Sequence, residues 1–163
     1  MREKTRLEAH ALSLGKLIGN LQSLEMGARM ALVKFDQRAA EQVKTQLPHV
    51  KAGDLVELNA FTNSDDLTQS LEKFNKRVKP ECRIDINPIV DLRDALAHGR
   101  TFGSGPIMHL RILKFSRKAI AGKVSVELAA DMTNEWFREK IQLLMQALEK
   151  VRKALDYEKR EFT

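Results

Sequence analysis

Two long apolar repeats constrain the fold of this chain more than any other feature of its sequence. Near the C-terminus, apolar residues recur at spacings of four and three: Phe137, Ile141, Leu144, Leu148, Val151 and Leu155. A second series with this spacing lies near the N-terminus: Leu14, Leu17, Leu21, Leu24, Ala28, Ala31 and Phe35. Such spacing places each series on one side of an α-helix. Because both stripes have to be buried, the sequence predicts a mainly helical core.

The remaining helical segments are expected between these two stripes. The first helix should run from about Thr5 to Gln46, and its glycines favour a kink or the close approach of another backbone. These glycines are Gly15, Gly19 and Gly27. A further helix should begin at Ser64-Asp65-Asp66, a capping hydroxyl followed by two acids, and end before Pro80. Its expected apolar face consists of Leu67, Leu71, Phe74 and Val78.

Two β-rich segments precede the last helix. Residues 107–116 and 123–129 are predicted to pair as a β-hairpin, because Val124, Val126 and Leu128 alternate with polar residues as in a half-buried strand. The glycine-rich segment 99–106 is expected to be a loop. We therefore predict one all-α domain over residues 1–163. It should be a helical bundle with a small β-hairpin inserted before the long C-terminal helix.

The segment 87–99 carries charged residues where a plain core helix has none. Asn87 and Pro88 are typical of a helix start, and Gly99 is expected to end the helix in a left-handed conformation. Asp91, Asp94 and His98 share one side of this helix, and Arg93 lies beside Asp94. We therefore expect the chemistry of the chain on this helix.

The motif Arg93-Asp94-Ala-Leu-Ala-His98 resembles the Arg-polar-x3-His signature of the HEPN superfamily (higher eukaryotes and prokaryotes nucleotide-binding domains). The resemblance implies an all-α bundle whose site is built across a homodimer. It also implies a metal-independent endoribonuclease without a cofactor, as in toxins and phage-defence effectors, with RNA and an antitoxin protein as partners. One subgroup has Tyr two residues after the His. Arg100 occupies that position here, which argues against that subgroup.

Arg93 and His98 are the residue types that RNA cleavage by its own 2′-hydroxyl group requires. A His suits the base and the acid of this reaction, and an Arg can fork onto two phosphate oxygens. One chain supplies each only once, so two-fold symmetry would complete the site, and Asp94 would orient a side chain within it. The alternatives are a non-catalytic nucleotide- or RNA-binding module, a polar network at a helix interface, or a purely structural dimerisation protein.

The charge of the chain is mildly basic. There are 28 Lys and Arg residues against 22 Asp and Glu residues, a net charge of +6. Between residues 111 and 123 there are five basic residues and no acid. The residues predicted to contact RNA are Arg100, Arg111, Lys114, Arg117 and Lys118. The alternative for this stretch is a solvated hairpin edge, which lysines keep from pairing with other sheets.

The sequence argues against several other functions. The only cysteine, Cys82, excludes an intramolecular disulfide and argues against zinc, and we predict no metal site. Asp91, Asp94 and His98 form too generic a set to indicate one. Apolar runs of membrane-spanning length and a signal-peptide core are both lacking, so a cytoplasmic protein is expected. Glu25, beside the N-terminal stripe, is either a boundary carboxylate in water or a group that orients Arg93 or His98.

Overall fold

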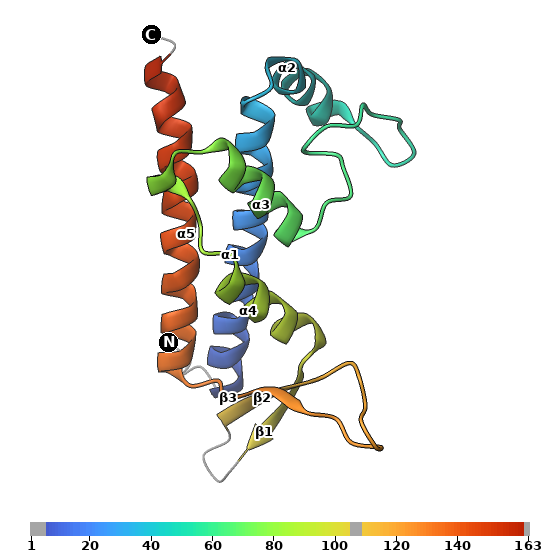
Figure 1. Cartoon of the computed structure of the whole chain (residues 1–163), viewed down its shortest axis with the longest axis vertical. Helices are drawn as coiled ribbons and strands as arrows, with labels where there is room; N and C mark the ends of the chain where they lie inside the picture. Colours follow the sequence, from blue (N-terminus) through green and yellow to red (C-terminus); the bar gives the residue numbers. More distant parts are fainter. Residues whose placement is uncertain (1–5, 105–108, 162–163) are drawn as a thin grey trace. The chain divides into compact units, whose positions relative to one another are not determined.

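The computed structural model describes residues 6–104 and 109–161, and over these residues the chain is mostly helical (Figure 1). The helices are α1 (Arg6–Lys34), α2 (Gln37–Gln46), α3 (Leu67–Arg77), α4 (Asn87–His98) and α5 (Asn134–Glu161). The strands are β1 (Arg100–Ser104), β2 (His109–Phe115) and β3 (Val126–Asp131). This order confirms a mainly helical chain with a small β element before the long C-terminal helix. None of the described helices combines the length and apolar content that crossing a membrane requires.

The chain divides into two compact units. One comprises Met1–Leu21 with Asn87–Leu144, and we call it the sheet unit. The other comprises Gln22–Ile86 with Met145–Thr163, and we call it the helical unit. The division falls inside α1 and inside α5, so each long helix contributes residues to both units. The single domain expected over residues 1–163 stays a prediction.

In the sheet unit, α4 covers one side of a three-stranded antiparallel sheet of order β1-β2-β3. Ile112, in the middle of β2, faces the end of α4 and is 1% exposed. The buried residues of this unit are His10, Leu17, Leu21, Ile89, Leu92, Ala95, Ile112, Met132, Phe137 and Leu144. The sheet therefore serves as one wall of a core whose other walls are helices.

The sheet contains one strand more than the predicted hairpin. Residues 100–104, in the segment expected to be a loop, form β1, which pairs with β2 from Arg100↔Leu113 to Ser104↔His109. The loop prediction is wrong here because β2 supplies the backbone hydrogen bonds that the local propensity of a glycine-containing segment does not. The second predicted strand is shifted and runs from Val126 to Asp131. Residues 105–108, at the end of the predicted loop and the start of the first predicted strand, lie outside the described residues.

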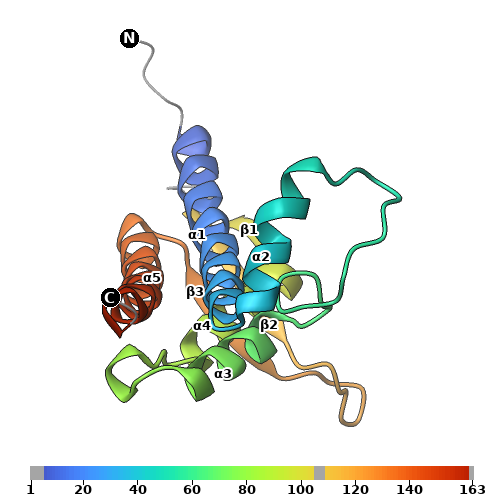
Figure 2. The same ribbon diagram turned by 90° about the horizontal axis from the view of Figure 1, so that it is seen from above.

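In the helical unit, the long N-terminal segment is broken in two, as the sequence suggested. α1 ends at Lys34 and α2 begins at Gln37, with Asp36 between them in an extended conformation. Asp36 Oδ1 accepts hydrogen bonds from the backbone nitrogens of Arg38 (3.1 Å) and Ala39 (3.2 Å), which caps α2. After α2 the chain forms an irregular excursion before α3, visible in both views (Figure 2).

α1 and α5 pack closely and run in the same direction within the helical unit. A Cβ placed on Gly27 would lie 3.4 Å from Val151 Cγ1, and further along Lys34 Nζ donates to Leu155 O (3.0 Å). The buried members of the predicted α1 stripe are Leu17, Leu21, Leu24, Ala28 and Ala31. On α5 the buried line is Phe137, Leu144, Ala147, Val151 and Ala154, whereas Ile141, Leu148 and Leu155 are only partly buried. Gly27, which has no side chain, allows the close approach at Val151.

The start of α3 differs from the prediction. Asp66 caps the helix instead of Ser64: its Oδ1 accepts from the Gln69 backbone nitrogen (2.8 Å), and Gln69 Oε1 accepts from the Asp66 backbone nitrogen (3.0 Å). This reciprocal pair satisfies two free N–H groups at once, which a lone hydroxyl at Ser64 does not. The predicted apolar face is confirmed for Leu67, Leu71 and Phe74, which are buried. Val78, the fourth predicted member, is only partly buried and lies just after the helix in an extended conformation.

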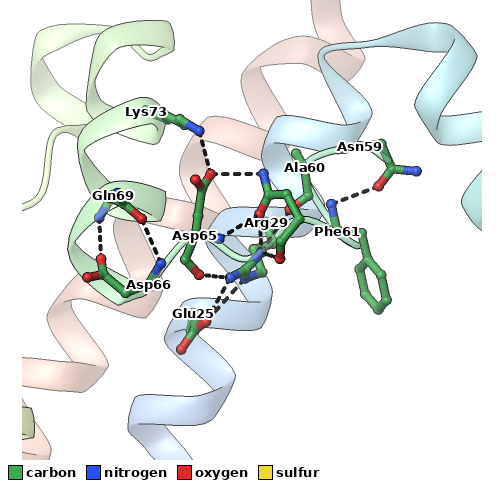
Figure 3. A network of polar contacts seen from close by, with 10 residues as sticks. Glu25, Arg29, Asn59, Ala60, Phe61, Asp65, Asp66, Gln69 and Lys73 are labelled. Carbon is green, nitrogen blue, oxygen red and sulfur yellow. Dashed lines mark hydrogen bonds and ion pairs between the residues drawn. The ribbon is translucent and has the colours of Figure 1, made fainter. Parts of the chain in front are cut away.

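Arg29 holds the segment before α3 against α1 (Figure 3). Although it is an arginine, it is only 9% exposed. Its Nη1 donates to Ala60 O (3.1 Å) and Asn63 Oδ1 (2.7 Å), and its Nη2 donates to Asp65 O and to Glu25 Oε1 (3.1 Å). One side chain thus satisfies acceptors from a segment with no helix or strand of its own, which fixes that segment in place.

The carboxylate of Asp65 extends the same network to α3. It accepts a hydrogen bond from Lys73 Nζ, and this bond is the main cause that lowers the pKa of the Asp65 carboxyl group (Figure 3). A carboxyl group with a lowered folded-state pKa stabilises the fold above its ordinary pKa. The contribution is lost as the pH falls through the lowered value.

Candidate functional site

α4 turns its apolar residues inward and its motif residues outward. Ile89, Leu92 and Ala95 are buried, whereas Asp91, Arg93 and His98 are exposed and Asp94 is partly buried. The helix begins at Asn87 and ends at His98, which confirms the predicted bounds. The motif is therefore available on the surface of the sheet unit.

Within the motif, Arg93 and Asp94 form an ion pair. Arg93 Nη1 lies 3.0 Å from Asp94 Oδ1, with 47% of the Arg93 side chain exposed. Arg93 and His98 are separated by about 140° around the helix axis, whereas Asp94 and His98 share one side. By pairing with Arg93, Asp94 draws the guanidinium group toward the side that carries His98. The His98 side chain forms no hydrogen bond or ion pair within the part of the chain that the structure describes.

Gly99 ends α4 for a reason that the sequence did not indicate. Its φ angle is not in the left-handed region, so the predicted left-handed stop is wrong. Instead, a Cβ at this position would overlap Ala95 O and lie 2.9 Å from Ile112 Cγ1. Gly99 N also donates to Ala95 O (2.8 Å). A glycine is needed because the chain passes from helix to strand directly against β2.

We expect Gly99→Ala to lower the free energy of unfolding by about 2 kcal/mol, because the added methyl group has to displace backbone or the buried Ile112 side chain. Gly15→Ala is the matched control. Gly15 lies in α1 of the same unit with open space around its Cβ position, so this change should stabilise the helix by roughly 0.5–1 kcal/mol. Urea denaturation of both variants checks the prediction, and equal effects would contradict it.

The predicted RNA-contacting residues on β2 are paired with acids from β3. Arg111 Nη1 lies 3.3 Å from Asp131 Oδ1, and Lys114 Nζ lies 3.3 Å from Glu127 Oε2. The stretch 111–123 has no acid in sequence, but sheet pairing brings two acids beside it. Arg111 and Lys114 are therefore each paired with an acid in the structure, and their contact with RNA stays a prediction.

The other three predicted residues have no acidic partner within the described residues. The Arg100 guanidinium carbon lies 5.3 Å from the centroid of the Phe115 ring, a cation–π arrangement. Arg117 and Lys118 are exposed in the β2–β3 connection, which projects from the sheet in both ribbon views (Figures 1 and 2). The structure thus separates the five cations into three groups. Arg111 and Lys114 are each paired with an acid, Arg100 lies over the Phe115 ring, and Arg117 and Lys118 are exposed at the start of the β2–β3 connection.

Two further groups considered from the sequence have structural surroundings of their own. Glu25 pairs with Arg29 on its own helix, so its carboxylate has a partner other than Arg93 or His98. Cys82 is buried, and this burial raises the pKa of its thiol, so it is not a ready nucleophile.

Asp91, Asp94 and His98 do not come together as a set of metal ligands. Across residues 6–104 and 109–161, the structure contains no group of three His, Cys, Asp or Glu side chains that could hold a metal ion. His10 is buried, and the centroid of its ring lies 6.1 Å from that of the Phe137 ring. It therefore belongs to the core of the sheet unit.

The acids that β3 places beside Arg111 and Lys114, the aromatic side chains on the sheet and the buried Arg29 were not among the residues predicted from the sequence. The sequence contained a signal for one of these acids. If the alternation of apolar and polar residues over 124–128 is continued to residue 131, Asp131 falls on the polar side, and in the structure it is paired with Arg111. Phe102 went unnoticed because its segment was expected to be a loop. For Arg29, a cation directly after the buried Ala28 was the available signal.

Comparisons of the chain with models of protein families, with curated proteins and with solved structures give no match. The site is therefore interpreted from its own residues, and the likeness to the HEPN superfamily depends on the six residues from Arg93 to His98.

Proposed function

We propose that this protein is a metal-independent endoribonuclease of the HEPN type, with Arg93, Asp94 and His98 as its site. The observation that carries the proposal is the arrangement on α4: the Arg93–Asp94 pair at 3.0 Å, with His98 one turn after Asp94 on the exposed side. A plain surface helix gains little from such a pair. A phosphodiester, by contrast, needs both a fixed guanidinium group and an imidazole nearby.

The proposed reaction uses the nucleophile that RNA contains. The 2′-oxygen attacks the adjacent phosphorus, the new O2′–P bond forms, and the P–O5′ bond breaks. A neutral His98 takes the 2′-hydroxyl proton, and a protonated His98 from a second chain gives a proton to the leaving 5′-oxygen. Arg93 neutralises the charge that develops on the non-bridging oxygens. The products are a 2′,3′-cyclic phosphate and a free 5′-hydroxyl group.

A homodimer is part of this proposal because each chain contributes one Arg93 and one His98. A two-fold axis near α4 would bring two copies of each to one phosphate. Such an activity in a cell would be toxic unless controlled, so a toxin or phage-defence role with an antitoxin protein as partner is the setting that we propose for it.

The second candidate is a non-catalytic RNA- or nucleotide-binding module. The observation behind it is that Asp94 engages one nitrogen of Arg93, which leaves less of the guanidinium group for the two-point phosphate contact that transition-state stabilisation requires. The two candidates differ in turnover, since a binding module retains intact RNA.

The deciding experiment incubates the purified full chain with single-stranded RNA in the presence of EDTA. We expect cleavage in the presence of EDTA and 2′,3′-cyclic phosphate ends, identified by mass spectrometry of the products. Light scattering on the same sample should give the mass of a dimer. Loss of cleavage in EDTA, or binding without cleavage, would overturn the ribonuclease proposal.

We expect Arg117 and Lys118, exposed at the start of the β2–β3 connection, to contribute to RNA affinity through phosphate contacts. Arg117→Ser with Lys118→Ser removes two cations that have no acidic partner among the described residues. The slope of log affinity against log salt should then become less steep by about 1.4, since each phosphate contact on a single strand contributes about 0.7. Lys114→Ser is the matched control, because Glu127 already neutralises this lysine. Fluorescence anisotropy across a salt series measures both, and equal slopes for all proteins would contradict the prediction.

A further inference from the structure

The sheet has a second face, opposite the one that α4 covers. In the register, Phe102 is paired with Arg111, and Arg100 with Leu113. Directly paired residues point to the same side and successive residues alternate, so these side chains lie on the side opposite Ile112. Phe115 belongs to the same side, because the Arg100 guanidinium group lies over its ring. We call this set the open face, and it consists of Arg100, Phe102, Arg111, Leu113 and Phe115.

Arg100 and Phe102 of the open face are exposed, whereas Arg111, Leu113 and Phe115 are partly buried. Phe102 is 44% exposed, whereas Ile112 on the opposite face is 1% exposed. Val126, paired with Phe115, is 55% exposed. An aromatic ring and a stacked guanidinium group thus lie side by side on a surface that the described residues leave accessible.

We propose that the open face binds single-stranded RNA by stacking nucleobases on the Phe102 ring and on the Arg100 guanidinium plane, which Phe115 supports from beneath. Unpaired bases stack on aromatic rings and on arginine planes, and a sheet presents such groups at spacings that suit successive bases. The cation of Arg100 is complementary to the phosphates that accompany these bases. A partner protein fits less well, since arginine is one of the two stacking groups and has no acid beside it within the described residues.

The charges around the open face indicate on which side of it the phosphate backbone of the bound RNA should lie. Asp131 pairs with Arg111 at one end, which makes that end unfavourable for phosphate. Beyond Phe115 the chain continues to the exposed cations Arg117 and Lys118. The phosphate backbone should therefore lie toward the β2–β3 connection.

This inference deepens the proposed function and rests on it in one respect, namely that RNA is the ligand. Only Gly99 separates His98 from Arg100, so their Cα atoms are within about 7 Å of each other along the chain. β1 is an edge strand. An RNA chain whose bases stack on the open face can therefore cross the β1 edge of the sheet. It would then present a neighbouring phosphate to the end of α4.

The test measures binding of a short single-stranded RNA that contains 2-aminopurine, a base whose fluorescence falls when it stacks. All proteins carry His98→Ala so that no probe is cut. Phe102→Leu keeps the apolar bulk but removes the ring, and we expect about tenfold weaker binding with less quenching. Phe102→Tyr keeps the ring and should bind as the parent does. Arg100→Lys keeps the charge but removes the plane and should also reduce quenching.

The control is Leu58→Ala, which removes an 82% exposed apolar side chain from the helical unit and should change neither affinity nor quenching. If Phe102→Leu binds and quenches as the parent does, the inference is wrong. It is also wrong if the parent does not bind the probe, and concentration-dependent self-association lost in Phe102→Leu would then identify the face as a protein interface.

The outcomes separate this inference from the proposed function. If protein with His98 intact cleaves RNA but Phe102→Leu leaves its KM unchanged, the ribonuclease proposal stands and the stacking inference fails. If the probe binds with quenching that depends on Phe102, but protein with His98 intact cuts no RNA, the inference stands and the ribonuclease proposal fails.

Discussion

Arg93→Ala and His98→Ala should each lower kcat for RNA cleavage by a factor of about a hundred to a thousand, roughly 3 kcal/mol or more of transition-state stabilisation. Removing Arg93 leaves the charge on the phosphate oxygens without its cation. Removing His98 leaves the 2′-hydroxyl proton without a base. The measurement is single-turnover cleavage of a labelled RNA by folded protein, with circular dichroism used to verify the fold.

The two substitutions should not be additive. If Arg93 and His98 act on the same transition state, the double variant should be little worse than either single variant. Arg93→Lys should restore only part of the activity, because an ammonium group cannot fork onto two oxygens. His49→Ala is the matched control, since His49 is exposed in the helical unit. Cleavage by His98→Ala at the wild-type rate would contradict the proposed mechanism.

Arg29→Met should lower the free energy of unfolding by about 3 kcal/mol or more, the largest stability effect that we predict for a single side chain. Methionine matches much of the apolar length of arginine but donates no hydrogen bonds. The change leaves Ala60 O, Asn63 Oδ1 and Asp65 O without the donor that they have in the structure. Buried acceptors without a partner are more costly than the hydrogen bonds were favourable.

Arg38→Met is the control for this substitution. Its side chain is 81% exposed, and it forms an ion pair with Glu57 at 3.4 Å, so its loss should cost no more than about 1 kcal/mol. Urea denaturation compares the two variants. Amide hydrogen exchange should also become faster for residues 59–66 in Arg29→Met. A loss for Arg29→Met no greater than that for Arg38→Met would contradict a role for Arg29 in holding this segment.

The features of the fold that were predicted correctly depend on residues close together in the sequence. The N-terminal stripe and the bounds of α4 are local features: neighbours three and four residues apart define a helical side, and Asn87 and Pro88 suit a helix start. For the same reason, the exposure of Arg93 and His98 follows from their spacing relative to Leu92 and Ala95. The break between α1 and α2 falls beside Asp36, which caps α2, and not at any of the three glycines that favoured a kink.

The features that local spacing does not contain were missed or wrong. Gly99 looked like a helix stop of the left-handed kind, but it is required by the approach of Ile112, thirteen residues later. Arg111 looked free, but its partner Asp131 is separated from it by 20 positions. The Asp66 cap, by contrast, is a local feature that was missed, because Gln69 three residues later completes a capping box with it.

The sequence by itself determined where the long helices lie and which side of α4 carries its charges, because helical periodicity is a property of neighbours. Only the tertiary structure decided that residues 100–104 form a strand, that β3 neutralises Arg111 and Lys114, and that Arg100 and Phe102 share an open face. Each of these depends on strand pairing. Pairing joins residues distant in sequence, and its register determines which side chains meet.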